Sequence, residues 1–103
     1  MNIKSPTFIN YYIPYYAPRS FPTIEKVARH ILNKALDGEK VIVYKHKGVA
    51  QAIAKSQNDG DGYADCFTIS VSDPCGWGVF VKSDKDRCGV RCSDKVRLYL
   101  DIH

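Results

Sequence analysis

A stripe of apolar residues with the period of an α-helix is the feature that most constrains how this chain folds. In the segment IEKVARHILNKAL, residues 24–36, apolar side chains recur at spacings of three and four residues and so fall on one helix face. Thr23 is a favourable N-cap residue for such a helix, and Gly38 is a favourable residue just past its end. The sequence therefore predicts an amphipathic helix over residues 23–37.

After Gly38 apolar residues alternate with polar ones, which is the period of a β-strand. The corner Lys47-Gly48 separates the first two alternating segments and predicts a β-hairpin. Short connections join the later segments, and short connections favour antiparallel pairing. We therefore predict an α+β fold in which one amphipathic helix packs on a four- to five-stranded antiparallel sheet. The predicted strands, all within residues 40–103, cover residues 40–46, 48–56, 63–72, 77–83 and 95–103.

The N-terminal aromatic segment, residues 1–22, contains INYYIPYYAPRSFP, which holds four tyrosines and three of the chain's five prolines. The prolines exclude a regular helix, so we expect an extended segment. Neighbouring residues of an extended segment face opposite sides, and about half of these tyrosines should therefore face outward. Exposed tyrosines are enriched at protein interfaces because they offer a large contact area at low entropic cost. The predicted partner-binding residues are Tyr11, Tyr12, Tyr15, Tyr16 and Arg19.

The composition is that of an ordinary globular domain, with 45% hydrophobic and 25% charged residues in a chain of 103. A chain of this length rarely supports two cores, so residues 1–103 are predicted to form a single domain. No stretch reaches the roughly 18 consecutive apolar residues of a membrane span. The N-terminus also lacks the apolar run and cleavage site of a signal peptide, and we therefore expect a cytoplasmic protein.

Basic residues are concentrated in the first part of the chain, which has a formal net charge of +4 overall. Up to residue 58 there are nine Lys and Arg against three carboxylates, whereas the remainder has six against eight. A basic helix face next to a basic hairpin tip would suit a phosphate backbone, so nucleic-acid binding is the alternative function. No aromatic motif or G-x-x-G loop of the common RNA-binding modules accompanies these residues. The candidate nucleic-acid contacts are Lys26, Arg29, Lys34, Lys45 and Lys47.

Four cysteines admit three interpretations: free thiols, a zinc site or a disulfide. Four thiolates can close a tetrahedral zinc site, but the usual pattern places C-x2-C on both arms. Here the spacings are C-x8-C and C-x3-C at the two ends of the set. The weak zinc candidate consists of Cys66, Cys75, Cys88 and Cys92.

Signatures of catalysis and of cofactor binding are absent from the sequence. There is no phosphate-binding glycine motif, and no histidine stands in a pattern that relates it to a nucleophilic cysteine. We therefore predict no catalytic residue, no cofactor and no enzymatic activity.

The outward tyrosines and the uneven charge favour a small, non-enzymatic protein-binding module. Small single-domain proteins without motifs are often inhibitors that phages or mobile elements direct against a host defence complex, and by this analogy we expect such a role. Pairing of two copies through an exposed edge strand, as a homodimer, is a further expectation.

Overall fold

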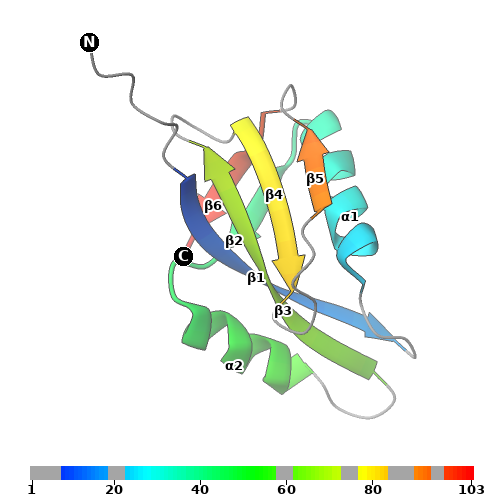
Figure 1. Ribbon diagram of the computed structural model, residues 1–103. Helices are drawn as coiled ribbons and strands as arrows, with labels where there is room; N and C mark the ends of the chain where they lie inside the picture. The colour runs from blue at the N-terminus through cyan, green and yellow to red at the C-terminus, as the bar shows by residue number, and fades with distance from the viewer. Residues whose placement is uncertain (1–7, 19–22, 58–61, 73–76, 84–89, 94–96) are drawn as a thin grey trace.

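The computed structural model describes six stretches of the chain, residues 8–18, 23–57, 62–72, 77–83, 90–93 and 97–103. Within them the chain alternates between strands and helices before it ends in a run of strands (Figure 1). In chain order the elements are β1 (Phe8–Pro18), α1 (Ile24–Leu36), β2 (Lys40–Val43), α2 (Lys47–Gln57), β3 (Gly62–Ser72), β4 (Trp77–Ser83), β5 (Val90–Ser93) and β6 (Tyr99–Ile102).

These strands form two separate sheets. One is antiparallel and has the order β1-β3-β4-β5, and the other is a parallel pair of β2 and β6. A single bridge joins them, because the N–H groups of Tyr12 and Tyr44 each donate to the other residue's carbonyl at 2.8 Å. The prediction of an α+β fold with a four-stranded antiparallel sheet is confirmed.

Helix α1 forms as its sequence predicts and carries the main core. Thr23 caps it, since its hydroxyl accepts a hydrogen bond from the Lys26 N–H at 3.2 Å. Gly38, with φ of +73°, lies just past the C-terminal end in a conformation that favours glycine. The apolar face of α1 packs against strands of both sheets, namely β2, β4 and β5. Its buried residues are Ile24, Val27, Ala28, Ile31 and Ala35.

The predicted hairpin at Lys47-Gly48 is wrong, because residues 47–57 form helix α2. The Ala50 N–H donates to the His46 carbonyl at 3.3 Å in the first helical turn. Ala50 and Ala54, which are four residues apart, are the buried side chains of α2. Clustered small residues imitate a strand's alternation, whereas alanine has the highest helix propensity of any residue. The structure therefore has a second helix that the sequence reading missed.

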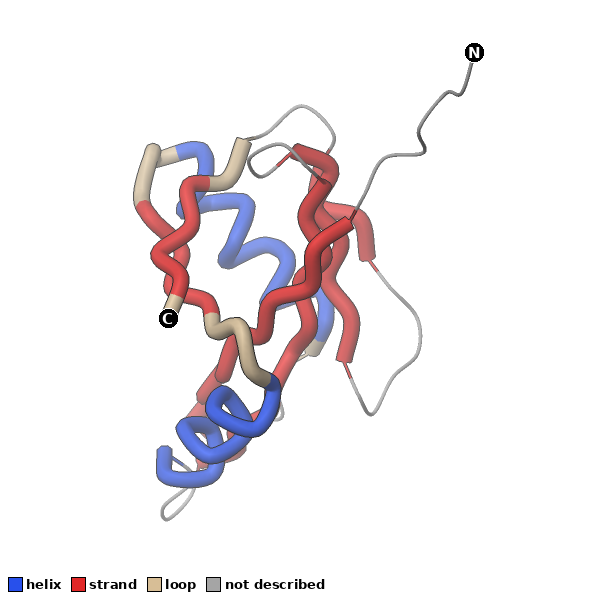
Figure 2. The backbone as a smooth tube through the Cα atoms, turned by 90° about the vertical axis from the view of Figure 1, so that its left-hand side faces the viewer, coloured by secondary structure: helices blue, strands red, loops and turns tan. Residues whose placement is uncertain are grey.

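The two helices cover opposite faces of the antiparallel sheet. Phe67 and Ile69 of β3 belong to the main core on the α1 side. Cys66 and Thr68, which alternate with them, are buried outside that core cluster. Helix α2 contacts β1 and β3, and Figures 1 and 2 agree that it lies apart from α1. We conclude that α2 covers the Cys66 and Thr68 face.

The predicted extended conformation of the N-terminal aromatic segment is confirmed for its described part, which forms an edge strand, β1, paired antiparallel with β3 from Phe8 to Pro18. The prediction that the C-terminal strand joins the antiparallel sheet is wrong, because β6 pairs with β2 in parallel. Helix α2 explains this error, because the chain that leaves β2 turns into a helix and leaves β2 open to a distant parallel partner. None of the helices in the described stretches is long and apolar enough to cross a membrane.

Candidate functional site: an apolar cleft between the two sheets

All four described tyrosines of β1 are half-buried, and none projects fully into solvent. Tyr11 and Tyr15 pack against the main core on the same side as the buried Ile13. Tyr12 and Tyr16 alternate with them and so belong to the face that α2 contacts. The expectation that half of the tyrosines face outward assumed that one face of this segment is open to solvent. Helix α2 covers that face of β1. Arg19 lies outside the described residues.

Tyr15 connects β1 to α1 through aromatic contacts. Its ring meets those of Phe67 and His30 edge to face, with centroid distances of 6.3 and 5.8 Å. Partial burial lowers the pKa of His30 from its usual 6.5, nearby Lys34 lowers it further, and Glu39 opposes the shift. At neutral pH His30 is therefore uncharged and packs against Tyr15. This contact gives Tyr15 a structural role.

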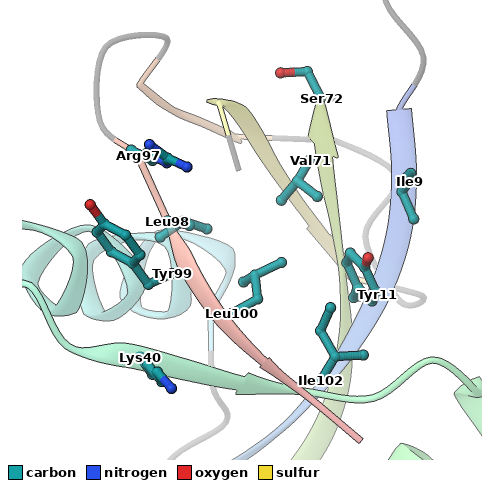
Figure 3. A pocket seen from close by; sticks show the side chains of 10 residues that line it. All are labelled: Ile9, Tyr11, Lys40, Val71, Ser72, Arg97, Leu98, Tyr99, Leu100 and Ile102. Atoms are coloured by element: carbon teal, nitrogen blue, oxygen red, sulfur yellow. The ribbon is translucent and has the colours of Figure 1, made fainter. Parts of the chain in front are cut away.

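Tyr11 instead lines a cleft of about 420 Å³ between the antiparallel sheet and β6 (Figure 3). This volume is within the range of about 300–1,000 Å³ that is typical of ligand sites. Val71, Leu98 and Leu100 are also part of the main core or pack against it, so the cleft opens directly onto that core. The described lining residues are Ile9, Tyr11, Lys40, Val71, Ser72, Arg97, Leu98, Tyr99, Leu100 and Ile102.

The rim of the cleft exposes large apolar side chains. Ile9 from β1 is 42% exposed, and Tyr99 and Ile102 from β6 are 49% and 41% exposed. Single exposed apolar residues are normal on a protein surface, whereas a group gathered around one concave site is a feature of interaction surfaces and ligand-binding grooves in general.

Two cations and no carboxylate stand among the described lining residues. Lys40 is the β2 partner of Tyr99 in the parallel pair, and the guanidinium of Arg97 lies 5.5 Å from the centre of the Tyr99 ring. Neither cation forms an ion pair within the described stretches; the carboxylate of Asp101, also in β6, lies 3.3 Å from the His103 imidazole. The cleft therefore combines an apolar floor with a positively charged rim.

The predicted nucleic-acid contacts are not brought together on one surface. Lys26 and Arg29 are exposed on α1, and Lys34 is half-buried near its end. Lys45 and Lys47 are exposed where β2 leads into α2, and α2 lies apart from α1 in both views (Figures 1 and 2). The predicted hairpin tip does not exist, so the basic surface that it was to share with α1 is split.

The two described cysteines, Cys66 and Cys92, form no disulfide and lie on opposite faces of the antiparallel sheet. Cys66 is buried on the α2 side, whereas Cys92 packs against the main core on the α1 side. The Cys92 thiol donates to the Ala28 carbonyl at 3.6 Å, and burial raises its pKa to about 11. This thiol is therefore protonated at neutral pH, whereas a cysteine that binds a metal ion or acts as a nucleophile does so as a thiolate. Cys75 and Cys88 lie outside the described residues, and no cluster of metal-binding side chains occurs within them.

Among the predicted partner-binding residues that the structure describes, only Tyr11 lines the cleft. The other lining residues come from β1, β2, β3 and the C-terminal segment, and the parallel pairing of β2 with β6 brings Lys40 next to that segment. The alternation of Leu98, Leu100 and Ile102 is the sequence signal that points to this site, since it predicts one apolar strand face. Comparison of the chain with known protein families, with curated proteins and with solved structures finds no match.

Proposed function

We propose that this chain is a non-enzymatic protein-binding module whose contact surface is the cleft between the two sheets. The observation that supports the proposal is the exposed apolar rim around an opening that leads directly into the core. Aromatic and aliphatic side chains that fill such openings supply most of the binding energy at protein interfaces. In this proposal the contact surface consists of Tyr11, Tyr99 and their neighbours, and not of the four tyrosines of β1 together.

An inhibitory role against a host complex is a compatible form of the same proposal. A module without its own chemistry acts by occupying a surface on its partner, and a rim of exposed aliphatic and aromatic residues suits that action. The support for the inhibitory role is the analogy of size and composition, whereas the support for binding is the cleft itself.

The test is site-specific photo-crosslinking in an extract of the cells from which the chain comes. A photoreactive phenylalanine analogue replaces Tyr99 at the cleft rim, and a matched protein carries it at Gln51, which is exposed on α2. We expect a discrete protein adduct from position 99 and none from position 51. Equal capture at both positions, or nucleic acid as the only crosslinked species, would show that the cleft is not a protein-binding surface.

A further inference from the structure

The main chain on both sides of the cleft has hydrogen-bonding groups without a strand partner. In β6 the flanking His103 N–H donates to the Val43 carbonyl, and the His103 carbonyl accepts from the Lys45 N–H, at 2.9 and 3.0 Å. Successive residues of a strand direct these groups to alternate sides, so those of Leu100 and Ile102 point away from β2. Figure 3 shows Lys40 of β2 on one side of β6, whereas Leu100 and Ile102 project from β6 toward β1 and β3 on the other. No described strand pairs with this second edge of β6.

The same reasoning applies to β1 across the cleft. Tyr12 uses its N–H and carbonyl to bond Tyr44, on the side away from β3. The main-chain groups of Phe8 and Asn10 therefore point to that side too, where β2 has already turned into α2. Free strand edges next to an apolar groove are the features that receive an extended peptide.

The cations at the rim indicate which kind of segment fits. Lys40 and Arg97 are both lining residues, and no carboxylate stands among the lining residues that the structure describes. A second copy of β1 would not complement them, because FINYYIPYYAP has no charged residue. A partner segment that places a carboxylate beside its apolar anchor satisfies both parts of the site, and the chain's net charge of +4 favours its approach.

We propose that the cleft receives an extended segment of an acidic partner protein. The segment pairs with the free edge of β6, inserts an apolar side chain between Val71 and Leu100, and directs a carboxylate to Lys40 and Arg97. This inference rests on the proposed protein-binding function and specifies the partner's chemistry.

The first experiment selects binders from a library of random displayed peptides with the full chain as bait. We expect the enriched sequences to contain aliphatic or aromatic residues next to Asp or Glu. Enrichment of basic peptides, or no enrichment, would overturn the inference. Crosslinking from position 99 is independent of this result, so a failed selection with successful crosslinking would leave the protein-binding proposal standing.

The second experiment measures the affinity of a selected peptide by fluorescence polarisation. The double variant Lys40→Glu/Arg97→Glu should weaken binding about tenfold or more. The matched control Lys55→Glu/Lys82→Glu makes the same charge change at exposed positions outside the cleft and should leave the affinity within about twofold. Equal weakening in both variants would show that only overall charge matters, and circular dichroism checks that both remain folded.

The third experiment tests pairing with the strand edge through the peptide's own amides. N-methylation of alternate amides on one side of the peptide should abolish binding, and methylation of the other alternate set should not. Tolerance of both sets would exclude edge pairing. Light scattering that shows a dimer, which the Lys40→Glu/Arg97→Glu variant dissociates, would identify a second copy as the occupant. Displacement of the peptide by dodecanoate at micromolar concentration would identify a small amphiphilic carboxylate instead.

Discussion

The two helices cover the antiparallel sheet in different ways. Helix α1 buries five side chains, including the fully buried Val27 and Ile31, in a core that reaches both sheets. Helix α2 buries only Ala50 and Ala54 and contacts β1 and β3. The contact of α1 is made mainly by large branched aliphatic side chains, whereas α2 contacts the sheet through the methyl groups of alanines.

This difference separates what stabilises the fold from what shapes its surface. Burial of a large aliphatic side chain contributes about 1.5–3 kcal/mol, whereas an alanine adds only a fraction of that. Most of the folding free energy should therefore come from the α1 side. Because α2 buries little, its contribution is to cover the even-numbered residues of β1 and to turn the chain away from β2, which leaves the cleft open.

The largest effect should follow truncation at the centre of the α1 contact. Ile31→Ala removes a fully buried side chain and leaves a cavity, and it should lower the free energy of unfolding by about 2–5 kcal/mol. Ile42→Ala, at an exposed position of β2, is the matched control and should change it by less than about 0.5 kcal/mol. Urea unfolding followed by circular dichroism measures both; equal losses would contradict the placement of the core.

An intermediate effect should follow enlargement of a residue in the α2 contact. Ala54 is 4% exposed, and Ala54→Leu should cost about 1–3 kcal/mol because the added atoms separate α2 from the sheet. Ala52, in the same helix, is exposed, and Ala52→Leu should be nearly neutral. If both variants unfold at the same urea concentration as the parent chain, α2 does not approach the sheet through its alanines.

The same contrast explains how much of the fold the sequence predicts. Helix α1 is predictable because a wide stripe of large apolar residues has only one regular arrangement that buries it. Helix α2 is not, because its buried stripe consists of two alanines, and in a short segment these fit strand and helix periods alike. Intrinsic propensity favours the helix, since the segment has three alanines in eleven residues. Weighing propensity above alternation would have corrected the assignment.

The cleft is harder to predict than either helix. The strand face of Leu98, Leu100 and Ile102 follows from alternation, but its neighbours do not. No turn joins two parallel strands, and β2 and β6 are far apart in the sequence. The local sequence of either strand therefore gives no information about their contact. The missed helix compounded the error, because the predicted hairpin paired residues 40–46 with residues 48–56, a segment that forms a helix and not a strand.

A smaller effect should follow loss of the α1 cap. Thr23→Ala removes the acceptor of the Lys26 N–H and should cost about 1 kcal/mol. Thr23→Ser keeps the hydroxyl and should restore most of the stability. If the serine variant is as unstable as the alanine variant, the methyl group of Thr23 and not its hydroxyl is what matters.

The smallest effect, and the only stabilising one, should come from the glycine in α2. Gly48 is helical, and a Cβ added there would meet no atom within 4 Å. Gly48→Ala should therefore raise the free energy of unfolding by about 0.5–1 kcal/mol, because alanine loses less backbone entropy when the helix forms. The gain requires α2 to be a helix, since a hairpin corner would favour glycine at this position.

Gly38→Ala is the matched control, because it also has open space around the added Cβ but a φ of +73°. It should destabilise the chain by about 1 kcal/mol through backbone strain alone. Opposite signs for the two glycine variants, measured by the same urea titrations, would establish that one residue starts a helix and the other follows one. Destabilisation by both would return residues 47–57 to the hairpin interpretation and would close the strand edge on which the cleft depends.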